Sequence, residues 1–550
     1  MKTSKTNLNK FSFAIVMLAL LLNCSEKKKS YNSVEETLYE EEISLDYQQD
    51  SRVYADESAP PPPSQHAATK RQEEIMRHHI PKNGEEYKLI KENAFHLVSK
   101  APLSTFSIDV DVASYSNLRR YINQGHLPAP NAIRTEELIN YFTYDYGQPE
   151  GKEPVKIALE AGSCPWNEKH RLVRIGLKAK EIADDKLPAS NLVFLIDVSG
   201  SMEGPNRLDL VKSSLKLLVN NLRKKDRVAI VVYAGSASEV LPSTSGRNKQ
   251  KIREALDQLS ADGSTAGGEG IQLAYKIAKK NFINGGNNRI ILCSDGDFNV
   301  GTSSTEDLEK LIENERKTGV FLTVLGYGMG NYKDNRMQVL AEKGNGNHGY
   351  IDNLQEANKI LVNEFGGTIH AVAKDVKLQV EFNPSQVQAY RLVGYESRML
   401  RDEDFNDDTK DAGEMGAGHT VTALYEIVPV GVKFEQNGNI DPLKYQTDNT
   451  ENNSGSKELL TVKMRYKLPE ESTSEKIELS LIDRKSDHTS TDFRFAAAVA
   501  MFGQLIRNSE YKGDATYDKV IALAKNAYGE DEQGYRREFV RLVETAKGLN

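Results

Sequence analysis

The chain has 550 residues, of which 39% are hydrophobic and 27% are charged. That composition is typical of an ordinary globular protein, and the length allows roughly two or three domains. The formal net charge of -8 is mild for a chain of this size. It gives no electrostatic case for binding nucleic acid and only weakly disfavours contact with anionic surfaces.

The first residues have the pattern of an export signal. Three lysines precede an apolar stretch at residues 11–22, which is too short for a comfortable membrane span. The stretch ends in the sequence LLNC at Cys24, which resembles a bacterial lipobox. The resemblance implies a signal peptide at residues 1–23 and a lipid on Cys24. Because Asn23 stands where a small residue is usual, an uncleaved anchor or a buried N-terminal helix remains the alternative.

Few cysteines are left for other roles. If Cys24 carries lipid, only Cys164 and Cys293 remain, too few for a disulfide scaffold even in an oxidising compartment. Cys293 lies in an apolar run at residues 290–293 and is predicted to be a small buried core residue. We do not expect a bridge between Cys164 and Cys293, although the sequence leaves it open.

Residues 24–84 are charged and polar, with four consecutive prolines and few apolar clusters. Such a composition predicts a disordered tether. The adjacent histidines His78 and His79 lie in this segment, and we interpret them as solvated side chains rather than metal ligands.

The pattern becomes structured in residues 85–150, where two helices are expected. Their apolar positions are Tyr115, Leu118, Ile122, Leu138, Tyr141 and Phe142. Asp111 is the expected N-cap of the first helix and Gly125 its stop. Asp109 and Asp111 together also suggest a second cation site, but helix capping is the favoured interpretation. The region is therefore predicted to be an N-terminal helical segment.

Residues 151–187 contain two alternating segments that predict β-strands, and residues 188–368 then alternate apolar runs with amphipathic helices. The apolar runs lie at residues 192–196, 228–232, 290–293 and 320–325. Because these runs are hydrophobic on both faces, they predict a mainly parallel sheet covered by helices on both sides, a doubly wound α/β domain. The helices are expected near residues 208–222, 249–259, 270–282, 305–316, 336–342 and 355–365.

The rest of the chain changes character twice. Residues 369–487 form a β-rich region, interrupted by acidic and glycine-rich loops at residues 402–418 and 447–456. Its strands are predicted at residues 376–382, 386–394, 421–428, 459–466 and 476–482. Residues 488–550 are predicted to be helical. Since strands flank the α/β region on both sides, we expect that region to be inserted into a β-sandwich that both flanks complete.

Oxygen-bearing side chains follow two of the predicted parallel strands. The sequence DVSGSM begins at Asp197, directly after the run at residues 192–196. Asp295 follows the run at residues 290–293, with Ser294 between them. In open α/β sheets, ligands bind beyond the carboxyl ends of strands, where the strand order reverses. Hydroxyl and carboxylate oxygens suit a hard divalent cation such as Mg²⁺. The sequence therefore predicts a divided metal site.

This arrangement resembles the metal-ion-dependent adhesion site of von Willebrand factor type A (vWA) domains. The resemblance assigns direct coordination to Ser199 and Ser201, joined by Thr265 in the ligand-competent state, and gives Asp197 and Asp295 the role of holding coordinated waters. It implies Mg²⁺, with Mn²⁺ as a possible substitute. One coordination position stays open, and an unidentified partner protein would fill it with an Asp or Glu carboxylate.

A second resemblance covers most of the chain. Segments at residues 104–111, 125–128 and 136–142 are similar to the leader of the bacterial YfbK-like family of vWA proteins. The family implies an extracytoplasmic lipoprotein with a vWA core. The expected location is the cell envelope, on a bacterial membrane through the lipid anchor, with the outer membrane favoured and its face left open.

Enzymatic interpretations fit the sequence less well. A phosphatase of the haloacid dehalogenase type needs an acid two residues after its aspartate, but position 199 is serine. The sequence GYGMG at residues 326–330 follows a strand, yet Asn331 breaks the spacing of a nucleotide loop. We therefore expect a protein-binding module that is not an enzyme and binds no nucleotide. A metal-stabilised envelope scaffold, and less so a metal-dependent hydrolase, remain alternatives.

Overall fold

The computed structural model describes residues 87, 89–183, 185–263, 267–296, 305–329, 334–365, 370–410, 412–434, 456–483 and 488–550. The predictions for the signal peptide, Cys24, the tether, His78 and His79 lie outside these residues, as do Thr265 and most of the predicted loop at residues 447–456. All the elements described below belong to one unit of the chain, residues 71–550.

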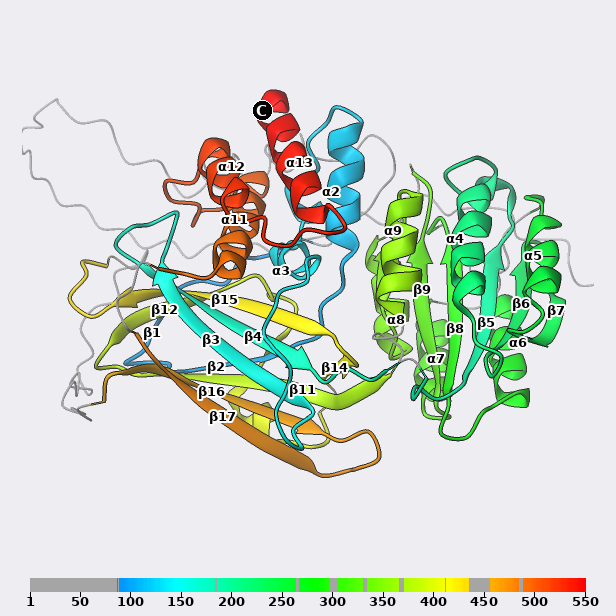
Figure 1. Ribbon diagram of the computed structural model, residues 1–550, viewed down its shortest axis with the longest axis horizontal. Coiled ribbons are helices and arrows are strands. Elements are labelled where there is room, and N and C mark those ends of the chain that lie inside the picture. The colour runs from blue at the N-terminus through cyan, green and yellow to red at the C-terminus, as the bar shows by residue number, and fades with distance from the viewer. Residues whose placement is uncertain are drawn as a thin grey trace, which may run out of the picture. The chain divides into compact units, whose positions relative to one another are not determined.

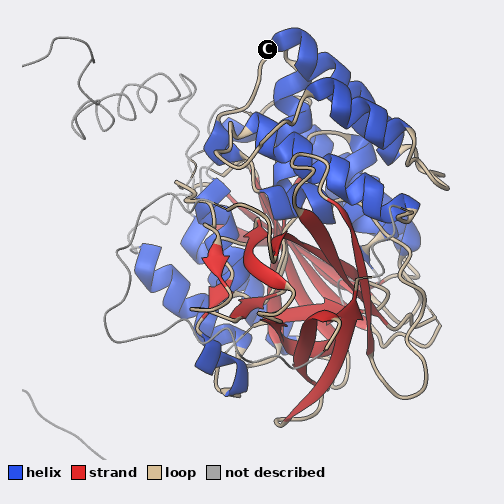
Figure 2. Ribbon diagram, turned by 90° about the vertical axis from the view of Figure 1, so that its left-hand side faces the viewer, coloured by secondary structure: helices blue, strands red, loops and turns tan. Residues whose placement is uncertain are grey.

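Two antiparallel sheets form a β-sandwich (Figure 1, Figure 2). One sheet has the strand order β1-β12-β15-β4-β3, and the other has the order β13-β2-β11-β16-β17, with β14 also paired to β11. The strands before the α/β region are β1 (His96–Leu97), β2 (Leu103–Ser107), β3 (Val155–Ser163) and β4 (Arg171–Ala179). Those after it are β11 (Ala371–Phe382), β12 (Val387–Val393), β13 (Met399–Leu400), β14 (Gly413–Gly416), β15 (Thr420–Pro429), β16 (Glu458–Lys467) and β17 (Ser474–Ile482).

Both sheets mix strands from the two sides of the α/β region. Strand β4 pairs with β15, and β2 pairs with β11, where Phe106 lies opposite Leu378. The inward side chains of the two sheets, among them Phe106, Val173, Val380 and Tyr425, share one buried core. The α/β region between β4 and β11 is therefore an insert in a sandwich made from both flanks.

Short strands depart from the predicted pattern. Strands β1 and β2 lie in the region predicted to be helical, and the predicted loop at residues 402–418 contains a 3₁₀ turn (Asp402–Asn406) and β14. Strands β1, β2 and β14 have two to five residues. They are strands because they pair with β11 or β12 rather than because of their local sequence.

The insert contains one six-stranded sheet of order β10-β9-β8-β5-β6-β7, in which only the β6–β7 pair is antiparallel. Its strands are β5 (Ser190–Asp197), β6 (Arg227–Tyr233), β7 (Ala237–Ser245), β8 (Asn287–Ser294), β9 (Val320–Gly326) and β10 (His348–Tyr350). Its helices are α4 (Leu208–Asn221), α5 (Lys249–Asp257), α6 (Gly267–Lys280), α7 (Thr305–Arg316), α8 (Asp334–Lys343) and α9 (Leu354–Asn358), which continues into a π-helical turn, η3 (Lys359–Asn363).

Both faces of this sheet are covered, as predicted. Along β5, Leu192 and Phe194 pack with helices α4, α5 and α9, while Val193 and Leu195 pack with α6, α7 and α8 on the other face. The four predicted parallel strands are confirmed. The sequence pattern did not indicate β7, an edge strand with mostly exposed or half-buried side chains, or the three-residue β10.

Five helices from the two ends of the chain pack together over the sheet of order β1-β12-β15-β4-β3 (Figure 1). They are α2 (Ala113–Asn123), α3 (Thr135–Asn140), α11 (Thr491–Ile506), α12 (Tyr517–Lys525) and α13 (Tyr535–Leu549). Their apolar side chains pack with Leu172, Val393 and Leu424 of that sheet. Among the described helices, none combines the length and apolarity needed to cross a bilayer.

One capping prediction is wrong. The N-cap of α2 is Val112, which makes no side-chain cap, and the backbone N–H of Ser114 is instead bonded to Glu137 Oε2 at 2.9 Å. Asp111 points to the insert, where its Oδ1 accepts a hydrogen bond from the backbone N–H of His348 at 3.0 Å. The predicted stop is confirmed, because Gly125 follows the helix with φ of +79°.

Candidate metal centre

The strand order of the insert reverses at β5. Strand β6 pairs with one side of β5, where Asp197 lies opposite Tyr233, and β8 pairs with the other, where Ile196 lies opposite Cys293. Because both pairs are parallel, the residues that follow β5 and β8 leave the sheet at the same end, beyond the carboxyl ends of the strands. Asp197 and Asp295 therefore come to one crevice, as predicted.

Hydrogen bonds hold the carboxylate of Asp197 from both sides. Its Oδ1 accepts from the backbone N–H of Ser199 at 3.0 Å and from Ser199 Oγ at 2.7 Å. Its Oδ2 accepts from Tyr233 Oη at 3.1 Å and from Ser294 Oγ at 3.0 Å. Ser199 Oγ also lies 3.1 Å from Ser201 Oγ. The two serines of the motif are thus gathered beside this buried carboxylate.

The neighbouring loop is fixed to the motif by its backbone. The N–H of Gly200 donates to Gly263 O at 3.0 Å, and the N–H of Asp262 donates to Val198 O at 2.8 Å. A Cβ at position 200 would lie 3.5 Å from that carbonyl, an ordinary contact distance. Thr265 itself lies outside the described residues, but the chain on its N-terminal side runs directly beside Gly200.

Burial gives the carboxylates of this crevice their electrostatic character. Asp197 is 0% exposed and Asp295 is 2% exposed. Burial raises the pKa of Asp197 above its ordinary value, and the nearby Asp295 raises it further, whereas the hydrogen bonds from Ser199 and Ser294 lower it. Burial, with Asp197 beside it, also raises the pKa of Tyr233, so its hydroxyl remains a donor. Two buried carboxylates in one crevice favour a bound cation.

The residues present fit a hard cation through their chemistry. Asp197, Ser199, Ser201 and Asp295 offer oxygen atoms only, as Mg²⁺ prefers. Within the described part of the chain, no group of three or more His, Cys, Asp or Glu side chains has a metal-site arrangement. A centre here would thus depend on alcohol oxygens as well as on its two carboxylates.

Two supporting residues were not among the predicted ones. Tyr233 and Ser294 both donate to Asp197, and each ends a strand next to β5. The position of Ser294 directly before Asp295 was the available sequence signal. Cys293, one residue earlier, is a buried free thiol whose pKa burial raises to about 12, which confirms its predicted place in the core.

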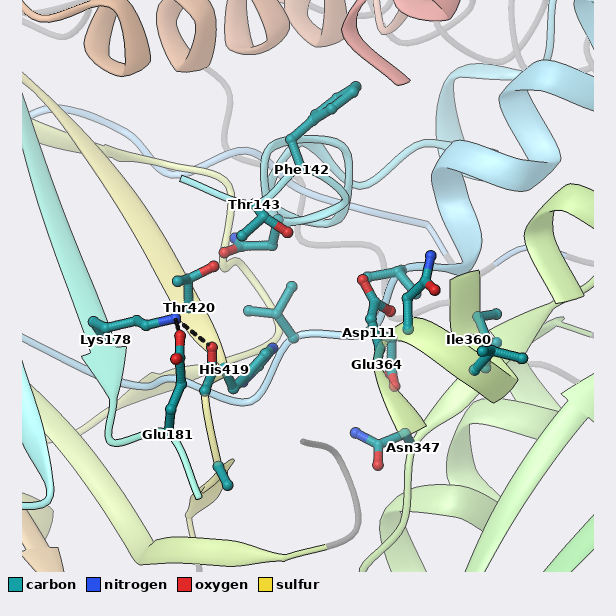
Figure 3. A pocket seen from close by; sticks show the side chains of 18 of the residues that line it. Asp111, Phe142, Thr143, Lys178, Glu181, Asn347, Ile360, Glu364, His419 and Thr420 are labelled. Carbon is teal, nitrogen blue, oxygen red and sulfur yellow. Dashed lines mark hydrogen bonds and ion pairs between the residues drawn. The ribbon is translucent and has the colours of Figure 1, made fainter. Parts of the chain in front are cut away.

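A separate cavity of about 470 Å³ lies between the insert and the sandwich (Figure 3). Lys178 and His419 lie on one side of it, and Asp111 and Asn347 lie on the other. The ammonium group of Lys178 already has partners. Its Nζ lies 2.9 Å from Glu181 Oε1 and donates a hydrogen bond to Gly418 O at 2.9 Å. No residue of the candidate metal centre lines this cavity.

Comparison with known proteins places the chain. The protein of Escherichia coli (strain K12) described as uncharacterized protein YfbK is 46% identical over 480 residues, which cover 86% of this chain and 83% of that protein. The chain belongs to the YfbK family. Within it, residues 191–363 match the model for the von Willebrand factor type A domain, and residues 367–549 match the model described as uncharacterized protein YfbK, C-terminal. Residues 81–174 match a model described as von Willebrand factor.

The insert of this YfbK-family chain is therefore a vWA domain, and both the family resemblance and the α/β fold class are confirmed. A vWA domain supports a role as a protein-interaction module. Weaker likenesses extend outside the family. Human inter-alpha-trypsin inhibitor heavy chain H3 is 27% identical over 257 residues, covering 43% of this chain and 28% of that protein.

Two solved structures show more distant likeness. A von Willebrand factor type A protein from Catenulispora acidiphila is 16% identical, with a TM-score of 0.38, and covers 72% of this chain and 92% of its own. Proximal thread matrix protein 1 of the mussel byssus, solved with zinc in its MIDAS motif, is 24% identical with a TM-score of 0.27, over 32% of this chain and 45% of its own.

Proposed function

We propose that the vWA domain binds a divalent cation, Mg²⁺ or Mn²⁺, and through it captures an acidic side chain of a partner protein. The metal residues would be Asp197, Ser199, Ser201, Thr265 and Asp295. The observation that carries the proposal is the crevice at the reversal of strand order, where two motif serines lie against one buried carboxylate and next to a second. The proposed setting is the cell envelope, with the chain held on a membrane by lipid on Cys24.

The charge balance of the crevice favours capture of a carboxylate. Two aspartates neutralise a dication, and neutral hydroxyl ligands donate only weakly to it. The metal would therefore remain a strong electrophile toward an Asp or Glu of a partner. A binding role is also favoured over catalysis because Ser199, Tyr233 and Ser294 already donate hydrogen bonds that hold Asp197.

Ser201→Ala is the sharpest test of this proposal. Ser201 is half-buried, and removing its hydroxyl takes away one proposed ligand while leaving the bonds to Asp197 in place. We expect Mg²⁺ and Mn²⁺ affinity, measured by calorimetry, to fall by at least about tenfold with little change in folding stability. Ser213→Ala removes an exposed hydroxyl of α4 and is the matched control.

Capture from envelope extracts would then identify the partner. Natural protein, Ser201→Ala and Ser213→Ala would be compared with Mg²⁺ and with EDTA. The expected partner is retained by the natural protein and by Ser213→Ala only when metal is present. A partner that stays bound in EDTA, while the protein loses thermal stability, would instead assign the metal a scaffold role.

A further inference from the structure

Basic side chains gather at the end of the vWA sheet where β5 and β6 begin, opposite the candidate metal centre. We call this end the basic edge. Two turns form this edge, one between α4 and β6 and the other between β7 and α5. They lie side by side, because the N–H of Gly246 donates to Asp226 O at 2.8 Å and Ser245 Oγ donates to Lys224 O at 2.9 Å. The basic edge consists of Arg223, Lys224, Lys225, Arg247, Lys249 and Lys251.

Little negative charge offsets this edge. Asp226 is 3% exposed and already pairs with Arg223, which leaves Asp185 as the exposed acid beside Lys225, whose Nζ donates to Asp185 O at 3.1 Å. Lys224, Arg247 and Lys251 are exposed, and they form no ion pair with another described residue. The edge therefore presents a local positive field on a chain whose formal net charge is -8.

The basic edge and the metal centre lie at opposite ends of the same strands. Arg227, which begins β6, pairs with Asn191 near the start of β5, whereas Tyr233, which ends β6, pairs with Asp197. Seven residues of extended strand separate the two ends by roughly 20 Å. A surface bound to the basic edge would thus leave the metal centre uncovered.

We propose that the basic edge docks the vWA domain onto an anionic phospholipid bilayer. The exposed side chains of Lys224, Arg247 and Lys251 are long and flexible, which suits diffuse attraction to many lipid phosphates rather than to one specific anion. The proposed membrane setting favours lipid phosphates over nucleic acid as the anionic partner. Docking would direct the metal centre away from the membrane, toward a partner protein. This inference rests on the membrane setting of the proposed function, but not on its metal.

The test uses the full chain with Cys24→Ser, so that no lipid anchor contributes. Sedimentation would compare vesicles of phosphatidylcholine alone with vesicles that contain about a third phosphatidylglycerol. We expect binding to the anionic vesicles, with release by high salt. The combined change Lys224→Glu, Arg247→Glu and Lys251→Glu should weaken binding at least about tenfold.

A matched variant controls for net charge. Lys100, Lys152 and Lys519 are exposed lysines elsewhere on the described surface, and changing all three to Glu makes the same difference in charge. That variant should keep most of the binding. Equal binding to neutral vesicles, or equal losses in the two triple variants, would overturn the proposal. Binding to soluble polyglutamate but not to anionic vesicles would overturn it in favour of an acidic protein.

The outcome is separable from that of the metal proposal. Since the basic edge contains no metal residue, docking should survive EDTA and the Ser201→Ala change. Folding of the edge variant would be checked by chemical unfolding. The variant should remain folded, because Lys251→Glu puts an acidic side chain in the first turn of α5, where the helix dipole favours negative charge.

Discussion

The guanidinium of Arg119 donates two hydrogen bonds to the carboxylate of Asp352, from Nε at 2.8 Å and from Nη2 at 2.5 Å. The same side chain contacts Glu356 at 2.7 Å and Glu538 at 3.2 Å, and only 2% of it is exposed. It thereby joins α2 to the vWA insert and to the C-terminal helix α13. Burial lowers the pKa of Arg119, but Glu356 and Asp352 raise it by more, so the group stays charged.

Replacing Arg119 with Met should be strongly destabilising, because three carboxylates would remain at this site without their shared cation. We expect the free energy of unfolding in urea to fall by about 3–5 kcal/mol. Lys476→Met is the control. It breaks an exposed pair with Glu478, and its effect should stay within about 0.5 kcal/mol. A loss below about 1 kcal/mol for the Arg119 variant would contradict this role.

Asp111 predicts a dependence of stability on pH. Its pKa is raised to about 8, first by burial and then by the nearby Asp109 and Glu137, while Arg398 and the hydrogen bond from His348 lower it. A raised pKa means that folding favours the protonated acid, so its stabilising contribution is full at low pH and is lost as the pH rises toward 8. The Asp111→Asn protein should therefore gain stability over the natural protein at pH 8 relative to pH 5, measured by thermal unfolding. Asn at exposed Asp518 should show no such trend.

Tyr233→Phe tests the hydrogen bond that Tyr233 donates to Asp197 at the candidate metal centre. The change removes the donor to Asp197 Oδ2 and leaves the ring in its buried position. We expect Mg²⁺ affinity in calorimetry to fall by about tenfold, because such supporting bonds orient the groups that bind a metal. Tyr528→Phe, in the C-terminal helical region, should leave the affinity unchanged. Equal affinities of Tyr233→Phe and the natural protein would show that this hydrogen bond does not support binding.

Removing the proposed metal should leave the chain folded. Each oxygen of Asp197 accepts two hydrogen bonds from the protein itself, so the crevice does not depend on a cation for its shape. Added Mg²⁺ should raise the unfolding temperature by mass action, equivalent to about 2.7 kcal/mol at a hundredfold excess over Kd. Calorimetric unfolding in EDTA and in increasing Mg²⁺ measures this effect. Global unfolding on chelation alone would contradict it.

The buried strands and the grouping of the site residues could be predicted from the sequence, because long apolar runs and regular spacing indicate them. Residues 192–196 predicted β5, and the position of Asp197 and Asp295 after separate strands predicted their shared crevice. Contacts between remote segments were not legible. Asp111 was expected to cap α2, but its carboxylate bonds to His348, which lies 237 positions later. Short strands such as β10 and β14 escaped for the same reason, since only their partners make them strands.

The interleaved sandwich has a consequence for the order in which the chain becomes structured. Strands β2 and β4 leave the ribosome early, yet their neighbours β11 and β15 follow only after the entire vWA insert. Until then, β4 is paired only with β3, and the edges of β2 and β4 that later pair with β11 and β15 stay open, which favours aggregation. The insert contains all the strands of its own sheet, the last of which is β10, and can therefore fold first. Translation that stalls between β10 and β11 should leave a folded vWA domain attached to an incomplete sandwich.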